Sequence, residues 1–447
     1  MIYRSIFAAA TLGFGLVKAE QASSFDVPPE VAEEYGCGPD CQAALAQANV
    51  IDLAAFGPDF DFDFYATANN FSGSEPGDVL KLQPIDVSAL ALTDMPSGAS
   101  GYKIQYTSQD LDGSPVPASG FVLLPGNTTQ PANLVAFAHG TAGGYRGCAP
   151  SNSQDLYRFQ PWMSLLEEGY AVVATDYAGL GNNYTGHKYV SLAAHANDLV
   201  HSVTAAQKAL PQDLSHDWVS VGHSQGGGAV WKLSEHALVQ DAESGYLGGV
   251  AVAPAATKAW ELVVFGLQKL QNSTDPNDLV MLSLLPGVVG AIERVFPDYD
   301  PAWVADGLKQ RLELADIGQY CVMGTGSLAV GLQPEQILNS FDVSGDTYLA
   351  EFQRLNAPGQ GDSASRPLLI VQGLNDPVVP ADSVKSTLQD TCEHGNPAHL
   401  SLYPGLDHDS ILTGASHEVL QFIADRFADA PYEEGCAESV RSPCKLA

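Results

Sequence analysis

Positively charged side chains are scarce in this sequence. Its 447 residues include 20 Lys and Arg against 52 Asp and Glu, so the formal net charge is −32. A surface of that sign repels phosphate backbones and anionic lipid head groups, which disfavours nucleic-acid binding. Any contact with a lipid interface must then come from apolar side chains. The hydrophobic fraction of 45% is ordinary for a globular protein.

Long apolar runs are also lacking. Outside the N-terminus, no stretch reaches the roughly eighteen consecutive apolar residues of a transmembrane helix. At the N-terminus, Arg4 precedes a short apolar run, and Val17-Lys18-Ala19 offers small residues for cleavage. We therefore predict a signal peptide over residues 1–19 and a secreted, soluble mature protein.

Metal and nucleotide motifs are incomplete. Cys37 and Cys41 have no second Cys or His pair at ligand spacing, which disfavours zinc. The glycine-rich stretch 140–144 is not followed by Gly-Lys-Ser/Thr, and residues 179–181 lack the third glycine of a dinucleotide site. No metal or organic cofactor is expected.

The seven cysteines fit an oxidising compartment, and their odd number leaves at least one without an internal partner. The sequons that also fit secretion begin at Asn70, Asn127, Asn183 and Asn272.

The first part of the chain is acidic and rich in turn formers. We treat residues 20–96 as an N-terminal segment that packs on the core. Within it, alternating Phe and Asp over residues 58–64 predict an edge strand with one apolar face. Two further strands, 102–106 and 118–125, flank the turn formers of residues 112–115 and should pair antiparallel.

From residue 134 onward, short apolar runs alternate with helical patterns. The predicted strands cover residues 134–138, 170–175, 218–221, 247–252, 367–371 and 399–403, and the predicted helices cover 192–210 and 417–428. Continuous apolar strands separated by helices are typical of a mostly parallel sheet covered on both faces. The fold class is therefore α/β, and functional side chains should lie beyond the carboxyl ends of the strands.

A long insertion interrupts this alternation. We assign residues 97–254 and 366–430 to the two parts of the core, 255–365 to a helical cap before the last two core strands, and 431–447 to a C-terminal tail. Helices are predicted within the cap over residues 260–270, 279–296 and 303–315. The apolar run 282–289 could line an acyl tunnel or bury a cap helix on the core, and burial is the commoner role.

The motif Gly222-His223-Ser224-Gln225-Gly226 stands between a predicted strand and a predicted helix. This context is typical of a nucleophile elbow, in which flanking glycines permit a strained turn that exposes the serine hydroxyl. A serine hydroxyl is a weak nucleophile and needs a base and an acid that orients the base. Asp376 and His408 follow the two later strands, and the order Ser224, Asp376, His408 is the order of this fold.

Other residues compete for these roles. Asp407 and Asp409 flank His408, although their short-range geometry makes Asp376 the better partner. Because His223 adjoins the serine on the backbone, its side chain should point elsewhere. The histidines that lie in strands, helices or surface positions rather than in the loop after the last core strand are His394, His399 and His417.

Acyl transfer also requires two N–H donors for an oxyanion. Gln225 supplies one by elbow geometry, and the loop after strand 134–138 should supply the other. We assign this second donor to Thr141, with Ala142 as the alternative.

Together these motifs resemble the fungal secretory lipases of the Candida-type lipase A group. The stretches that carry the resemblance are His139-Gly140-Thr141, Cys148-Ala149-Pro150-Ser151, Asp176-Tyr177-Ala178-Gly179-Leu180-Gly181, the elbow, and Asp376-Pro377-Val378-Val379-Pro380. The resemblance implies an α/β-hydrolase fold with a helical cap and hydrolysis of carboxylic esters, including acylglycerols. It also implies bridges Cys148–Cys321 and Cys392–Cys436. We add Cys37–Cys41, which leaves Cys444 unpaired.

The resulting hypothesis is a secreted serine ester hydrolase, a lipase or esterase, that acts through an acyl-enzyme. A serine peptidase or acyltransferase on the same fold, or a catalytically silent binding protein, are the alternatives. We expect a monomer that binds an ester or acylglycerol substrate, with transient contact between the cap and a lipid interface.

Overall fold

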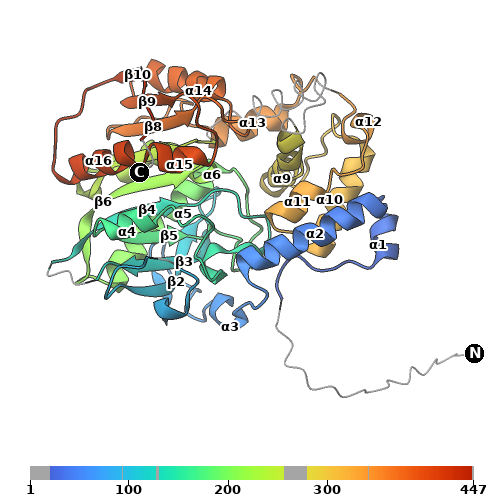
Figure 1. The fold of residues 1–447 in the computed structure, drawn as a ribbon, viewed down its shortest axis with the longest axis horizontal. Helices are drawn as coiled ribbons and strands as arrows, with labels where there is room; N and C mark the ends of the chain where they lie inside the picture. The colour runs from blue at the N-terminus through green and yellow to red at the C-terminus, as the bar shows by residue number, and fades with distance from the viewer. Residues whose placement is uncertain (1–20, 93, 127–129, 256–278, 341, 445–447) are drawn as a thin grey trace, which may run out of the picture.

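The protein has two parts, a sheet flanked by helices and a smaller helical lobe beside it (Figure 1). The computed structural model describes residues 21–444 apart from 93, 127–129, 256–278 and 341. The predicted signal peptide and the predicted helix 260–270 lie outside the described residues. Among the described residues, no helix is long and apolar enough to cross a bilayer.

The sheet has ten strands in the described chain, in the order β1-β2-β3-β5-β4-β6-β7-β8-β9-β10. Their bounds are β1 Val79–Ile85, β2 Ser100–Gln109, β3 Pro115–Leu124, β4 Ala132–Ala138, β5 Ala171–Thr175, β6 Leu214–His223, β7 Tyr246–Val252, β8 Leu368–Gly373, β9 Ala398–Tyr403 and β10 Cys436–Val440. β1, β2, β3 and β5 pair antiparallel, and every pairing from β5 to β10 is parallel. The predicted α/β fold class and its mostly parallel sheet are confirmed.

Helices cover both faces of the sheet, as continuous apolar strands require. One face packs on α5 Leu192–Ala209, α6 Gln225–Ser234 and α14 Ala381–Glu393, and the other on α4 Met163–Glu167, α15 Ser410–Gly414 and α16 Ser416–Phe427. Successive side chains of β4 alternate between the two cores, Ala136 toward the first and Phe137 toward the second. The short helix α7 Ala237–Gln240 follows α6.

The helical lobe is formed largely by the insertion between β7 and β8. Its described helices are α9 Leu279–Val295, α10 Asp306–Gly318, α11 Val322–Ser327, α12 Pro334–Ile337 and α13 Thr347–Asn356. The predicted helix 303–315 begins later than expected. The indole N–H of Trp303 donates to Asp346 Oδ2 at 2.9 Å, so Trp303 is an anchor in the core of the lobe rather than the first residue of α10.

The predicted edge strand over residues 58–64 is wrong, because this stretch forms the short helix α3 Phe62–Tyr65. The Asp61 carboxylate accepts a hydrogen bond from the backbone N–H of Phe64 at 2.9 Å and caps the helix. Phe64 and its neighbour Tyr65 are both buried, together with Phe60. The alternation of Phe and Asp therefore does not mark a strand with one face in solvent.

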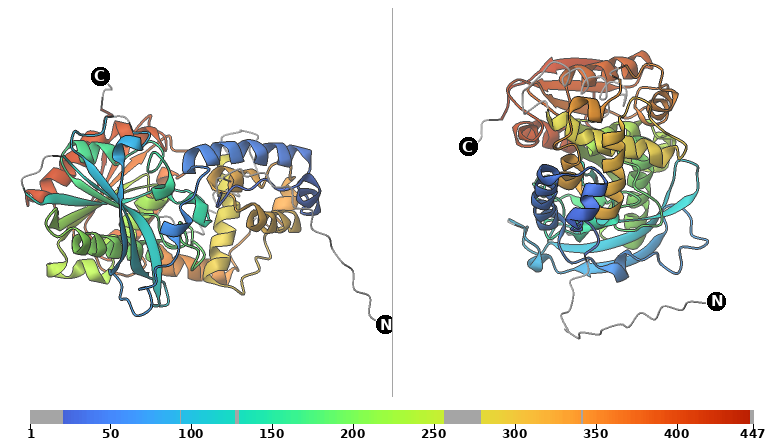
Figure 2. Two further views of the ribbon diagram at one scale, coloured as in Figure 1. Left: turned by 90° about the horizontal axis from the view of Figure 1, so that it is seen from below. Right: turned by 90° about the vertical axis from the view of Figure 1, so that its right-hand side faces the viewer.

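The N-terminal segment does not pack on the core alone. Helices α1 Pro29–Glu34 and α2 Pro39–Phe56 lie along the helical lobe (Figure 2), and only later residues of the segment join the sheet as β1. The guanidinium of Arg311 in α10 donates to the carbonyl oxygen of Gly36 at 2.6 Å. This corrects the expectation for residues 20–96, whose first half belongs to the lobe.

The C-terminal tail contributes a strand that the sequence did not predict. β10 pairs parallel with β9 at the edge of the sheet, and the Cys392–Cys436 disulfide ties its first residue to α14. The other two bridges, Cys148–Cys321 and Cys37–Cys41, are also as predicted, and Cys444 is free.

We predict that the double variant Cys392→Ser/Cys436→Ser folds but loses about 2–4 kcal/mol of unfolding free energy, because the bridge closes a long loop in the unfolded chain. Hydrogen exchange should accelerate in residues 436–440 and stay slow in the central strands. Equal acceleration in β4 would contradict a local role for this bridge.

Candidate active site

Ser224 occupies the turn between β6 and α6. Its backbone has φ 58° and ψ −119°, a conformation that L-residues rarely adopt. A Cβ on Gly226 would lie 2.0 Å from the Ala138 carbonyl oxygen, and a Cβ on Gly222 would lie 2.1 Å from the Gly226 carbonyl oxygen. Both glycines are therefore required by close backbone approach, and the turn they allow places Ser224 at the carboxyl end of the sheet.

The loops after β8 and β9 bring Asp376 and His408 to the serine. His408 Nε2 lies 2.9 Å from Ser224 Oγ, and His408 Nδ1 lies 2.8 Å from Asp376 Oδ2. Because an ionised carboxylate only accepts hydrogen bonds, Nδ1 carries the proton and Nε2 is the acceptor for the serine hydroxyl. All three residues are 8% exposed.

Asp376 is held in place by its own loop. The backbone N–H groups of Val378 and Val379 both donate to its Oδ1 at 2.8 Å, and Gln372 donates to Oδ2 at 3.1 Å. The carboxylate therefore meets His408 with Oδ2 already oriented.

The loop after β4 carries the other predicted donor. Thr141 Oγ lies 2.9 Å from the hydroxyl of Tyr189. Ala142, the alternative, is 1% exposed, and its carbonyl oxygen accepts from the Val322 N–H at 3.0 Å. Gln225 is the first residue of α6, so its backbone N–H has no partner within that helix. A helix N-terminus also favours negative charge nearby.

Known secreted lipases are similar in sequence to this chain. No family model matches the chain. The secreted triacylglycerol lipase LIP4 of Malassezia globosa is 24% identical over 401 residues, which cover 84% of this chain and 83% of that protein. The secreted triacylglycerol lipase LIP2 of Malassezia furfur is 24% identical over 404 residues, which cover 83% of this chain and 80% of that protein.

Solved structures agree with these relatives. Candida antarctica lipase A superposes with a TM-score of 0.67 at 16% identity, covering 86% of this chain and 90% of its own. The rice cell wall degrading esterase LipA of Xanthomonas oryzae gives a TM-score of 0.61 at 18% identity, covering 79% of this chain and 98% of its own. This chain has the α/β-hydrolase fold and is similar to secreted fungal lipases. The resemblance drawn from the motifs is confirmed.

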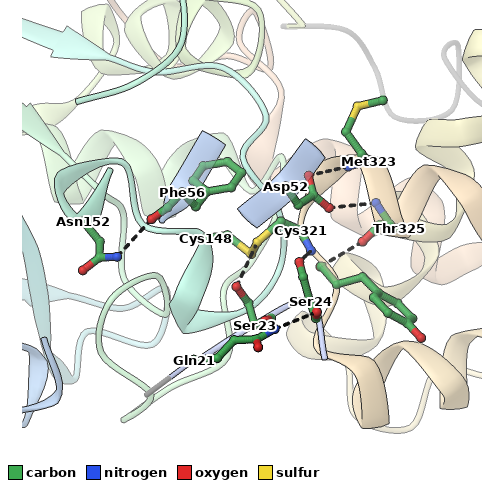
Figure 3. Close-up of a disulfide and its surroundings, with 12 residues drawn as sticks. Gln21, Ser23, Ser24, Asp52, Phe56, Cys148, Asn152, Cys321, Met323 and Thr325 are labelled. Atoms are coloured by element: carbon green, nitrogen blue, oxygen red, sulfur yellow. Dashed lines mark hydrogen bonds between the residues drawn. A yellow bond between two sulfur atoms is a disulfide. The ribbon is translucent and has the colours of Figure 1, made fainter. Parts of the chain in front are cut away.

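The loop after β4 is tied to the helical lobe. Gly143 forms an isolated β-bridge with Cys321, and the Cys148–Cys321 disulfide lies beside it (Figure 3). Close by, the Asp52 carboxylate accepts from the N–H groups of Met323 and Gly324 at 3.1 and 2.9 Å. Burial raises the pKa of Asp52 to about 6, and these hydrogen bonds oppose the rise.

A cavity of about 400 Å³ lies between this loop and the lobe. Thr141 and Tyr189 line it on the core side, and Leu284, Pro286, Leu312 and Val322 line it on the lobe side. Charged side chains, among them Arg294 and Lys309, also line it. In the run 282–289, Leu285, Val288 and Val289 are buried within the lobe, whereas Leu284 and Pro286 line the cavity.

The remaining candidates lie outside the hydrogen-bonded chain. Asp407 accepts from the N–H and hydroxyl of Ser410, chiefly the hydroxyl, which lowers the pKa of Asp407. Asp409 is exposed. His399 lies within β9, and His394 Nδ1 donates to the Asp390 carbonyl oxygen at 2.8 Å. His417 lies in the first turn of α16.

His223 has a contact that the sequence did not predict. As expected, it points away from the serine, yet its Nε2 donates to the His408 carbonyl oxygen at 2.8 Å. Burial, and then the neighbouring His408, lower the pKa of His223 to about 3, so its ring stays neutral. No sequence pattern links residues 185 positions apart.

Asp176, part of the motif shared with the lipases, is fully buried near the same strand ends. It accepts hydrogen bonds from Ser119 Oγ at 2.6 Å and from the N–H and Oγ of Ser151 at 2.8 and 2.5 Å. Burial raises its pKa despite these bonds. Its contacts join the loop after β5 to strand β3 and to the turn that carries Ser151, which is a structural role.

We predict that buried neutral histidines make the protein sensitive to acid. An unfolded histidine has a pKa of about 6.5, so below that pH the unfolded chain binds a proton that His223, with its pKa of about 3, does not. Each such group lowers the unfolding free energy by about 1.4 kcal/mol per pH unit between these values. His223→Gln should therefore lose stability less steeply between pH 6.5 and 4.5, measured by urea unfolding. The same substitution at His216, whose side chain is 66% exposed, is the control and should leave the slope unchanged.

Proposed function

We propose that this protein is a secreted lipase or esterase that hydrolyses carboxylic esters with Ser224, His408 and Asp376 as its catalytic residues. The observation that carries the proposal is the continuous chain of hydrogen bonds from Ser224 Oγ through His408 to Asp376. Each member stands at the carboxyl end of a different parallel strand, where this fold class keeps its functional groups.

In the proposed reaction, Ser224 Oγ attacks the ester carbonyl carbon while His408 Nε2 takes the hydroxyl proton. The N–H groups of Gln225 and Thr141 hold the oxyanion of the tetrahedral intermediate. His408 then gives its proton to the departing alcohol, which leaves an acyl group on Ser224. Water repeats the steps and releases the acid, while Asp376 keeps His408 in one tautomer.

The substrate class follows from the relatives and the cavity. Two relatives are named secreted triacylglycerol lipases and a structural neighbour is named an esterase, so we propose acylglycerols and simpler esters as substrates. The mixed lining beside Thr141 suits an acyl chain near the core. We further propose a signal peptide over residues 1–19, a monomer, and lipid contact through the cap.

Ser224→Ala should lower ester turnover by about 10⁴-fold or more and abolish labelling by a fluorophosphonate. Hydrolysis of p-nitrophenyl butyrate and mass spectrometry of the labelled protein measure the two effects. Ser220→Ala is the matched control, since it removes a buried hydroxyl from β6, the strand that leads to Ser224, where it is hydrogen-bonded to Tyr246. Near-normal turnover in the Ser224 variant would refute the mechanism, and failure of the fluorophosphonate to label Ser224 of the wild type would favour a silent binding protein.

A series of p-nitrophenyl esters of increasing chain length, with and without an oil interface, should show turnover of acyl chains longer than butyryl and an increase at the interface. Both are expected because apolar residues of the lobe, among them Leu284, Pro286 and Leu312, line part of the cavity beside Thr141. Peptide amides and acceptor alcohols are tested beside the esters. Faster cleavage of amides would favour a peptidase, and faster transfer to alcohols an acyltransferase.

A further inference from the structure

Tyr189 lies where the proposed oxyanion loop meets the cap. Its hydroxyl is 2.9 Å from Thr141 Oγ, and both residues line the cavity described above. Since either hydroxyl can donate to the other, the direction of this bond decides where the second proton points. No sequence motif points to a role for Tyr189.

The surroundings favour donation by the phenol. Tyr189 is 7% exposed, and burial raises its pKa to about 12, so it keeps its proton at any working pH. Thr141 is only half-buried. A phenol is the more acidic of the two groups and the better donor. When Tyr189 donates, the Thr141 hydroxyl proton is left to point elsewhere.

We infer that Tyr189 is a positioning residue that aims the Thr141 hydroxyl at the developing oxyanion. Thr141 Oγ–H then becomes a third donor beside the backbone N–H groups of Thr141 and Gln225. The inference rests on the proposed function, because it names a further part of the same site. No covalent step is added, since only hydrogen bonds change as the carbonyl oxygen becomes negative.

The backbone next to Tyr189 is strained. Val190, a β-branched residue, has φ 49°, in the left-handed region that such residues avoid. The next residue is fixed, because Ser191 Oγ donates to Asn356 Oδ1 of α13 at 2.7 Å. Strain of this kind persists where the surrounding structure enforces it, often at functional sites. Here it directs Tyr189 toward the loop.

The cap also holds the Tyr189 ring. Tyr189 belongs to the apolar core of the helical lobe with Leu285, Val288 and Ile292 of α9. A Cβ on Gly287 would lie 3.3 Å from two ring carbons, so α9 passes directly against the ring. The orientation of Thr141 therefore depends on the cap, although Thr141 belongs to the core.

The alternative is that the Tyr189–Thr141 hydrogen bond only stabilises the fold. Such a bond would have no effect on the transition state. A double-mutant cycle separates the two roles. Tyr189→Phe should lower kcat about tenfold and leave KM within about twofold, and Thr141→Val should lower kcat about 100-fold. The double variant should be no slower than Thr141→Val alone, because Tyr189 acts only through the threonine hydroxyl.

Two further measurements support the cycle. Affinity for a boronic acid, which mimics the tetrahedral intermediate, should fall by the same factor as kcat in Tyr189→Phe. Thr141→Ser, which keeps the hydroxyl, should retain kcat within about threefold. Tyr246→Phe is the matched control, because it removes a buried phenol that also lies 2.9 Å from another hydroxyl, that of Ser220. It should reduce thermal stability like Tyr189→Phe and leave kcat unchanged.

The inference is overturned if Tyr189→Phe has the same kcat as the wild type. It is also overturned if Tyr189→Phe lowers kcat by the same factor in the wild-type protein and in the Thr141→Val variant. If Tyr189→Phe fails to fold, the comparison of Thr141→Val with Thr141→Ser decides. An equal kcat in these two variants would refute the inference. The proposed function fails separately, when Ser224→Ala keeps ester turnover.

Discussion

The left-handed backbone of Ser224 is the constraint on which the rest of the site depends. It is possible only because β6 and α6 meet through glycines that leave no room for a Cβ. A Cβ on Gly226 would lie 2.0 Å from the Ala138 carbonyl oxygen of β4. The tight packing of two elements thus stores strain at one residue and turns its hydroxyl toward His408. A methyl group added at either glycine would disrupt both the packing of β6 against α6 and the alignment of the Ser224 hydroxyl with His408.

The helical lobe also supports the candidate site. It is joined to the loop after β4 by a disulfide and a β-bridge, and its helix α9 packs against Tyr189, which is hydrogen-bonded to Thr141 of that loop. The N-terminal helices lie along the same lobe, so the segments that support this loop come from distant parts of the chain. Preorganised donors require such support, because a loop that moves by an ångström loses its advantage in the transition state.

Much of the core could be predicted because its signals are local. A strand buried on both faces is a short apolar run, and the elbow is a run of five residues in sequence. Asp376 and His408 could be named because the order of strands implies where their loops meet.

The alternating Phe and Asp of residues 58–64 led to a wrong strand prediction, because Asp61 caps a helix there and the rings bury one another. Edge strand β10 was missed, since Cys436–Val440 has an exposed, polar pattern and is held by pairing and a disulfide.

The sequence by itself therefore determined the fold class, the elbow and the order of the three site residues, because periodicity and close glycine spacing are properties of neighbouring residues. Only the tertiary structure decided which groups hold these residues in place. His223 supports the His408 carbonyl and Tyr189 reaches Thr141 across long separations in the chain. Such contacts depend on how the cap and the strand ends come together, and no local pattern encodes that arrangement.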